Sequence, residues 1–219
     1  MRTICVTLND EKYTSMGGLY GTHEGGKPSR LARARQHFAE RGVNAQFFFG
    51  IHATQLAIEN TLTYEVDNPG TNFRIGPKPT GCWLSHRAVW AACLLLSEDP
   101  NELFFILEDD AKFPEDWKER VEAAVRDARD FDMLYIGSCC TEGRPTKHIA
   151  GNVYEVQWPL CNHGYIVRRS ALMTMIETQD AARLYAPIDI SLVFHTMEQL
   201  KVGTVKPRIL DQFDTEIPP

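Results

Sequence analysis

The chain has 219 residues, 43% of them hydrophobic and 24% charged, the balance of an ordinary globular protein large enough for one substantial domain. Its formal net charge of −6 gives no general attraction to nucleic acid or to an anionic membrane, so nucleic acid is not indicated as a partner. The longest apolar segment, near residues 89–96, is far short of a membrane span, and the apolar run at 4–8 is too short for a secretory signal. We therefore expect a cytoplasmic protein without a transmembrane segment.

The first half of the chain alternates β-branched runs with helical patterns. Residues 4–8 predict a strand, the glycine-rich stretch 12–28 a loop, and residues 30–41 a helix that Ser29 caps and Gly42 ends. A second strand is expected at 45–49 and a loop at 68–79. Thr80 is the expected cap of a helix that reaches about residue 97, with its apolar face made by Leu84, Ala88, Ala91, Ala92 and Leu95.

The second half begins with a continuous apolar run at 103–107, which is typical of a central strand buried on both faces. Helices are then expected at 114–129, 170–178 and 188–200, and further strands at 133–136, 153–156, 165–167 and 202–205. Strands that alternate with helices predict an α/β protein, with some antiparallel strands in the second half. We find no internal repeat and no linker, and therefore expect one domain, 1–219.

Six cysteines are present, and no two of them form a C-x-x-C pair: Cys5, Cys82, Cys93, Cys139, Cys140 and Cys161. Several lie in apolar stretches, where cysteine behaves as a small hydrophobic residue. We expect free, buried thiols and therefore a reducing compartment.

Three consecutive carboxylates, Glu108, Asp109 and Asp110, follow the apolar run at 103–107. Ligands of open α/β sheets bind at the carboxyl ends of the strands. Three like charges there cost stability unless a cation or hydrogen-bond donors compensate them. Mg²⁺ and Mn²⁺ take oxygen ligands and commonly bridge to substrate phosphates. The cluster therefore predicts a metal-assisted site, although Asp109 and Asp110 could instead merely cap the turn that follows.

Several segments, in order along nearly the whole chain, resemble motifs of glycosyltransferase family 25, the lipopolysaccharide and collagen-type galactosyltransferases. Residues 81–86 (GCWLSH) resemble the family's C-x-L-S-H helix start, and 106–111 (ILEDDA) resemble its I-L-E-D-D signature. Further matches are residues 164–171, the P-x-D at 187–189 and the glutamine followed by T-E-I at 212–217.

The resemblance implies a GT-A-like, Rossmann-like fold with a mixed, mostly parallel sheet flanked by helices. The nucleotide-sugar half would span about 1–112 and the acceptor half about 113–219. The resemblance also implies an inverting transfer, assisted by Mn²⁺ or Mg²⁺, of galactose or glucose from a nucleotide sugar, UDP-galactose being the leading example. The acceptor would be a glycan or glycoconjugate, as in lipopolysaccharide biosynthesis, and a lipid-linked acceptor would bring peripheral membrane contact.

The roles of single residues follow partly from this resemblance and partly from their own chemistry and position. Asp110 is the expected metal ligand, and the nucleotide-sugar-binding residues would be Asn9, Arg30, Ser85, His86, Glu108 and Asp109. An inverting transfer needs a base, for which Asp189 is the candidate; its alternative role is that of a favourable acid at a helix N-terminus. His163 and Trp158 are the candidates for acceptor contact, against the alternatives of an exposed loop histidine and a core tryptophan.

Two other functions stay open at this point. A sugar nucleotidyltransferase uses related metal chemistry, but it would want a glycine- and arginine-rich loop straight after the first strand, and the glycines at 17–26 come too late. A non-catalytic module of the same fold would bind a sugar or a partner without turnover. The acidic cluster together with Asp189 argues against that module, because uncompensated carboxylates cost stability.

Overall fold

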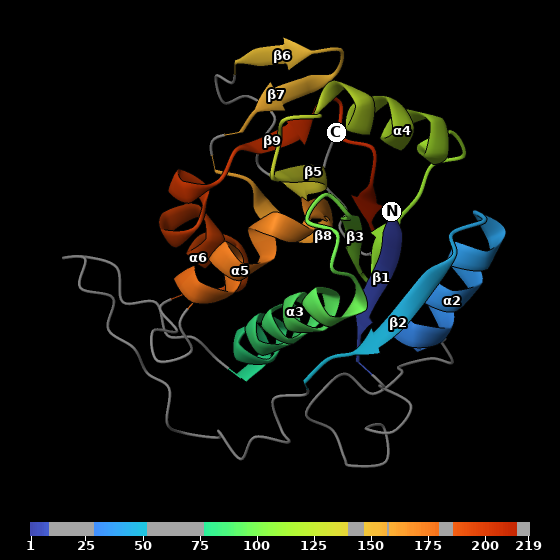
Figure 1. Ribbon diagram of the computed structural model, residues 1–219. Coiled ribbons are helices and arrows are strands. Elements are labelled where there is room, and N and C mark those ends of the chain that lie inside the picture. The colour runs from blue at the N-terminus through green and yellow to red at the C-terminus, as the bar shows by residue number, and fades with distance from the viewer. Residues whose placement is uncertain (9–28, 52–76, 140–146, 157, 180–185, 214–219) are drawn as a thin grey trace, which may run out of the picture.

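An eight-stranded mixed sheet organises the chain in the computed structural model (Figure 1). The structure describes residues 1–8, 29–51, 77–139, 147–156, 158–179 and 186–213. The strands of this sheet are β1 (Arg2–Thr7), β2 (Ala45–Phe49), β3 (Leu103–Glu108), β5 (Met133–Cys139), β6 (His148–Ala150), β7 (Val153–Glu155), β8 (Leu160–Arg168) and β9 (Val202–Val205). The helices are α2 (Arg30–Glu40), α3 (Pro77–Leu96), α4 (Trp117–Asp127), α5 (Arg169–Thr178), α6 (Ile188–His195) and the 3₁₀ turn Met197–Gln199.

The strand order is β2-β1-β3-β8-β5-β9-β7-β6. β1 pairs in parallel with β2 and β3, and β5 pairs in parallel with β9, whereas β8 runs antiparallel to both of its neighbours. β7 is likewise antiparallel to β6 and β9. Most strands therefore point in one direction, and the expected mixed, mostly parallel α/β sheet is confirmed, including its antiparallel strands in the second half.

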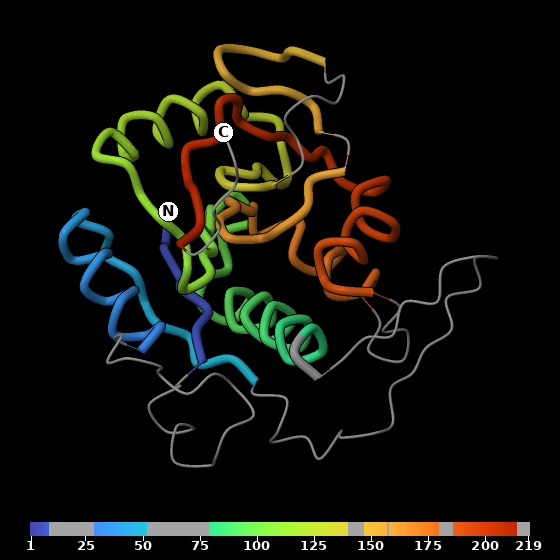
Figure 2. Tube along the Cα trace, turned by 180° about the vertical axis from the view of Figure 1, so that it is seen from behind, coloured from blue at the N-terminus to red at the C-terminus, as the bar shows by residue number. Residues whose placement is uncertain are grey.

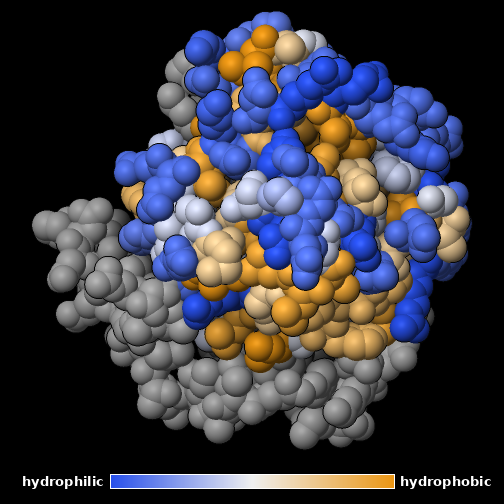
Figure 3. All heavy atoms as spheres, in the orientation of Figure 1, coloured by the Kyte–Doolittle hydropathy of each residue, from blue (hydrophilic) through white to orange (hydrophobic). Residues whose placement is uncertain are grey.

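Helices cover both faces of the sheet (Figure 1). Side chains of the central strand alternate between two cores: Phe104 and Ile106 pack in the cluster with α3, α5 and α6, whereas Phe105 and Leu107 pack in the cluster with α2 and α4. A strand buried on both faces explains why residues 103–107 are apolar without interruption. Figure 3 shows the outward face of α4 as hydrophilic, as expected for a helix whose opposite face packs against the sheet.

The ends of several elements follow local chemistry. Ser29 caps α2, because its side chain accepts a hydrogen bond from Ala32 N at 3.0 Å, and Gly42 adopts φ +64 just after the helix, so both expectations are confirmed. Thr80 is not a cap, because α3 already begins at Pro77, a residue that suits the first turn of a helix. The helix expected at 188–200 breaks after His195 into the short 3₁₀ turn.

The apolar face expected for α3 is wrong. Leu95 is 89% exposed, whereas Trp83, Val89, Trp90 and Cys93 are buried. The helix carries apolar residues nearly all round, so the pattern alone did not identify the buried face. The bulky aromatic side chains are the ones that pack in the core. Figure 3 shows apolar side chains at the surface over the region of α3.

A small second sheet lies beside the end of the central strand. β4 (Ala111–Lys112) pairs antiparallel with β10 (Asp211–Gln212), a contact between segments about a hundred residues apart in the sequence. The red C-terminal segment can be followed to this pairing in Figure 2. The amide of Phe213 donates to the carbonyl oxygen of Asp110 at 2.8 Å, so the C-terminal segment fastens the turn that carries the acidic cluster.

None of the described helices combines the length and the apolar character that a bilayer crossing requires. The expected loop at 12–28 and most of that at 68–79 lie outside the described residues, as does Asn9.

Candidate active site

Three neighbouring strands bring polar residues together at one end of the strands. Val6 pairs with Glu108 in the parallel register of β1 and β3, so Thr7 comes next to Asp109. Leu107 pairs with Gly164 in the antiparallel register of β3 and β8, so His163 and Asn162 follow on the side of the acidic cluster. The edge at which the ends of β1 and β3 meet is the place where open α/β sheets bind their ligands.

Asp109 is the most tightly held carboxylate of the cluster. Only 4% of the residue is exposed; Thr7 donates to its Oδ2 at 2.7 Å, and Nη2 of Arg30 lies 2.5 Å from its Oδ1. Burial raises the pKa of Asp109, although the charge of Arg30 and the bond from Thr7 oppose that rise. Because the Ser29 cap fixes the start of α2, the helix delivers Arg30, its first residue, to the cluster.

Asp110 is the least satisfied of the three. Its Oδ2 lies 3.1 Å from Nη2 of Arg30, whereas its buried Oδ1 has no hydrogen-bond partner in the described part of the chain. Burial, followed by the charges of Glu108 and Asp109, raises the pKa of Asp110 to about 7. A buried carboxylate oxygen that lacks a partner, next to two further carboxylates, fits a divalent cation, which would supply the missing positive charge.

Glu108 faces α3. Its Oε1 lies 3.1 Å from Nε2 of His86 and 3.8 Å from Sγ of Cys82. Burial alone would raise the pKa of Glu108, but the hydrogen bond from His86, with the charges of His163 and Arg30, brings it below the usual value. Glu108 is therefore held ionised beside its neighbours.

Cys82, His86 and Glu108 also form a possible metal-binding triad, because their ligand-type atoms all lie within 4.8 Å of one another. A thiol, an imidazole and a carboxylate would suit zinc better than Mg²⁺ or Mn²⁺. Burial raises the pKa of the Cys82 thiol well above its usual value, and the charges of Glu108 and Asp189 raise it further. The thiol therefore stays protonated and lies near both acids.

Asp189 lies in the first turn of α6, as its alternative role required. Its Oδ1 accepts from the amide of Ile190 and its Oδ2 from the amide of Cys161, both at 2.9 Å. Cys161 adopts φ +64, which non-glycine residues seldom do. The disulfide between Cys139 and Cys161 joins the end of β5 to the start of β8 at this point.

That disulfide corrects the expectation that all cysteines are free. The two residues are 22 positions apart in the sequence, and the antiparallel pairing of β5 and β8 brings their Cα atoms to 5.7 Å. Cys5, Cys82 and Cys93 carry free thiols.

The other candidates lie in varied surroundings. Ser85 is buried; its hydroxyl donates to the carbonyl of Gly81 at 2.6 Å and accepts from the amide of Ile51 at 2.8 Å.

His163 is buried against Leu210, whose carbonyl lies 3.3 Å from Nε2, and its Nδ1 has no partner among the described residues. Trp158 is 41% exposed and its ring meets Phe194 edge-on at 4.9 Å. The sequence-based reading missed Thr7 and Cys82, which contact Asp109 and Glu108.

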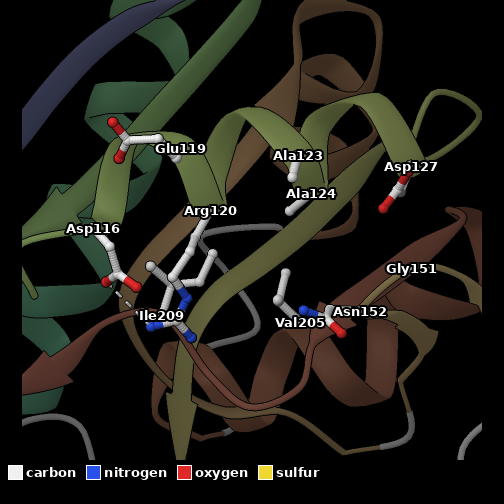
Figure 4. Close-up of a pocket in the computed structure, with 10 residues that line it drawn as sticks. All are labelled: Asp116, Glu119, Arg120, Ala123, Ala124, Asp127, Gly151, Asn152, Val205 and Ile209. Carbon is white, nitrogen blue, oxygen red and sulfur yellow. Dashed lines mark ion pairs between the residues drawn. The ribbon is translucent and has the colours of Figure 1, made fainter.

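A hollow of about 320 Å³ lies elsewhere, between α4 and the turn from β6 to β7 (Figure 4). It shares no residue with the acidic cluster. Asp116, Glu119 and Asp127 line it, and Arg120 is the one cation among the described residues of its wall. Three carboxylates would repel the phosphates of a nucleotide, so this hollow does not suit such a ligand.

Comparison with known proteins decides the family. The sequence profile described as "Glycosyltransferase family 25 (LPS biosynthesis protein)" matches residues 26–157, which include the acidic cluster and the start of α3. The chain belongs to glycosyltransferase family 25. The expectation drawn from the motifs is therefore confirmed.

Similar proteins carry the same family name. A "Glycosyltransferase 25 family member" of Aedes aegypti is 26% identical over 180 residues, and one of Drosophila melanogaster is 23% identical over 174; each match covers 74% of this chain and 28% of the relative. The chain thus spans less than a third of the length of these relatives. Among solved structures, a UDP-glucose pyrophosphorylase complexed with UDP-glucose aligns over 94% of this chain and 90% of that chain, with 12% identity and a TM-score of 0.46.

Proposed function

We propose that the chain is an inverting, metal-assisted glycosyltransferase that moves a galactose- or glucose-type hexose from a nucleotide diphosphate sugar, UDP-galactose foremost, to a hydroxyl of a glycan or glycoconjugate. The observation that carries this proposal is the buried Oδ1 of Asp110, which has no partner among the described residues although it lies beside Glu108 and Asp109. Family membership makes sugar transfer the first use to consider for that site.

Asp110 would hold the divalent cation, Mn²⁺ or Mg²⁺, with Oδ1 as its ligand. A bound cation would offset the negative charge that develops on the departing diphosphate. Arg30 is the residue of α2 nearest to the cluster, and its planar guanidinium suits phosphate oxygens, so it would bind the diphosphate. Asn9, Ser85, His86, Glu108 and Asp109 complete the proposed donor site, either by touching the nucleotide sugar or by holding the residues that do.

In the transfer itself, the acceptor hydroxyl oxygen attacks the anomeric carbon while the bond from that carbon to the diphosphate breaks. Asp189 would take the proton of the hydroxyl. The two backbone amides that bond to its oxygens fix the direction of the carboxylate. Trp158, half-exposed, would stack on an acceptor sugar, and His163 would lie on the acceptor side of the cluster.

The test is an assay of nucleoside diphosphate release from a panel of nucleotide sugars, with Mn²⁺ or Mg²⁺ and candidate glycan acceptors. Release that needs metal and rises with an acceptor is the expected result, and Asp189→Asn should lower kcat at least a hundredfold while donor binding persists. Nucleotide-sugar binding without turnover would point instead to a non-catalytic module. Formation of a nucleotide sugar from a nucleoside triphosphate and a sugar phosphate would point to a nucleotidyltransferase.

A further inference from the structure

Three buried side chains and the partly exposed carboxylate of Glu108 form one continuous hydrogen-bonded chain that ends at the acidic cluster. Nε1 of Trp90 lies 2.7 Å from the hydroxyl of Tyr165, and that hydroxyl lies 2.9 Å from Nδ1 of His86. Nε2 of His86 lies 3.1 Å from Oε1 of Glu108. The side chains come from α3, β8 and β3, and Trp90, Tyr165 and His86 are all fully buried.

The donors and acceptors of this chain fix one direction. The indole N–H of Trp90 can only donate, so the oxygen of Tyr165 accepts from it. The hydroxyl hydrogen of Tyr165 then has Nδ1 of His86 as its acceptor, and the imidazole carries its own hydrogen on Nε2, which points at Glu108.

The opposite tautomer leaves two defects. A hydrogen on Nδ1 would compete with the hydroxyl hydrogen of Tyr165, which has no other acceptor in the part of the chain that the structure describes. Nε2 would then face Glu108 as a second acceptor, which repels a carboxylate at 3.1 Å. Buried polar groups that lack partners are costly, so the arrangement with a hydrogen on Nε2 is the stable one.

We propose that Trp90, Tyr165 and His86 act as a positioning relay, which points the Nε2–H of His86 at Glu108 and holds that carboxylate ready to accept hydrogen bonds from hydroxyl groups of the ribose or hexose of the donor. The proposal rests on the donor site proposed above. It makes His86 a positioning residue rather than a contact of the donor. It also disfavours His86 as a metal ligand, because a metal on Nε2 would require the ring hydrogen to move to Nδ1, which faces the hydroxyl of Tyr165.

The first test removes the hydroxyl oxygen from each of two tyrosines in turn and compares the two variants. Tyr165→Phe deletes the hydroxyl in the middle of the relay. Tyr135→Phe is the matched control, because Tyr135 is equally buried, its ring centroid lies 6.1 Å from that of Tyr165, and its hydroxyl has no partner among the described residues. We expect Tyr165→Phe to raise the KM for the donor about tenfold with the KM for the acceptor unchanged, and Tyr135→Phe to change neither. Equal donor KM values for the two variants would overturn the relay.

A second measurement does not depend on activity. The ¹⁵N shifts of the ring nitrogens of His86, assigned by comparison with His86→Gln, report the tautomer in the wild-type protein. The relay predicts a neutral ring with its hydrogen on Nε2 and no change on addition of Zn²⁺. A hydrogen on Nδ1, or a zinc-induced shift of Nε2, would overturn it. Should no nucleotide sugar bind the wild type, the proposed function fails, whereas this measurement still decides the relay.

Discussion

Nη2 of Arg30 lies 2.5 Å from Oδ1 of Asp109, so the first residue of α2 neutralises a buried carboxylate at the end of the central strand. The arginine side chain is 54% exposed, whereas that of the aspartate is only 6% exposed. The pair is thus open on the side of the arginine. Under the proposed function, this arginine would exchange one carboxylate for a phosphate of the donor.

Removal of that charge should destabilise the protein and weaken donor binding. We expect Arg30→Met to lower the free energy of unfolding by about 1–2 kcal/mol at pH 7.5, less than a fully buried pair would lose, because Arg30 is half-exposed. Urea denaturation measures the change, and Arg126→Met, on the exposed face of α4, is the control for loss of one positive charge. Equal stabilities of the two variants would show that the pair contributes nothing.

Asp110 should make the metal-free protein less stable as the pH rises. Its pKa is raised to about 7, above that of an aspartate in an unfolded chain, about 4. Between these two values the folded state keeps a proton that the unfolded state has released, so the free energy of unfolding falls as the pH rises, and the penalty is complete above pH 7. Asp110→Asn should therefore be more stable than wild type by on the order of 2 kcal/mol at pH 8 and nearly equal at pH 4. Parallel pH profiles from urea denaturation without metal would contradict this expectation.

The disulfide between Cys139 and Cys161 should support both stability and catalysis. A loop of 22 residues closed by a disulfide contributes about 3 kcal/mol through the entropy of the unfolded chain. Reduction also frees the backbone of Cys161, whose amide holds Asp189, so kcat should fall with stability. Denaturation and turnover are measured with and without a phosphine reductant. The double variant Cys139→Ala/Cys161→Ala should not respond to the reductant, and a wild-type protein that does not respond either would rule out the role of the disulfide.

A pair of identical substitutions tests the faces of the helices. Leu172 is fully buried in α5, whereas Leu95 is 89% exposed at the end of α3. Leu172→Ala should cost about 2–5 kcal/mol, and Leu95→Ala should cost less than about 0.5 kcal/mol. Comparable losses, measured by thermal or urea unfolding, would contradict the exposed position of Leu95.

The longer strands could be located from this sequence, because local pattern decides them, whereas the short strands β4, β6 and β10 were missed. The strands at 45–49 and 202–205 have the expected bounds, and the central strand differs by one residue. The starts of two helices were harder to predict, since α3 begins at Pro77 rather than after Thr80, and α4 begins at Trp117 rather than at Pro114. Which face of α3 is buried depends on how the large side chains pack in the folded core. Because the helix is apolar nearly all round, its periodicity does not reveal that face.

The position of the acidic cluster at the end of a buried strand could also be predicted, but not the contacts within it. Three carboxylates after a buried strand indicated a ligand-binding edge, and the family motifs pointed to Asp110 as the metal ligand. The sequence did not show that Arg30 and Thr7 satisfy Asp109 while Oδ1 of Asp110 stays without a partner among the described residues. Those contacts depend on the strand register, as does the meeting of Cys139 with Cys161.

The most direct test of the proposed function is a thermal-shift comparison of the wild type with Asp110→Asn, using nucleoside diphosphates and nucleotide sugars with and without Mn²⁺. Asp116→Asn, which removes a carboxylate just before α4 and away from the cluster, serves as the control. A ligand that binds the folded state at a hundredfold excess over its Kd stabilises it by about 2.7 kcal/mol, which moves Tm by several degrees. We predict a Mn²⁺-dependent shift with a uridine nucleotide that Asp116→Asn keeps and Asp110→Asn loses. A well-folded wild type that shifts with no nucleotide, or an equal shift in Asp110→Asn, would contradict the assignment of the acidic cluster as a metal and nucleotide-sugar site.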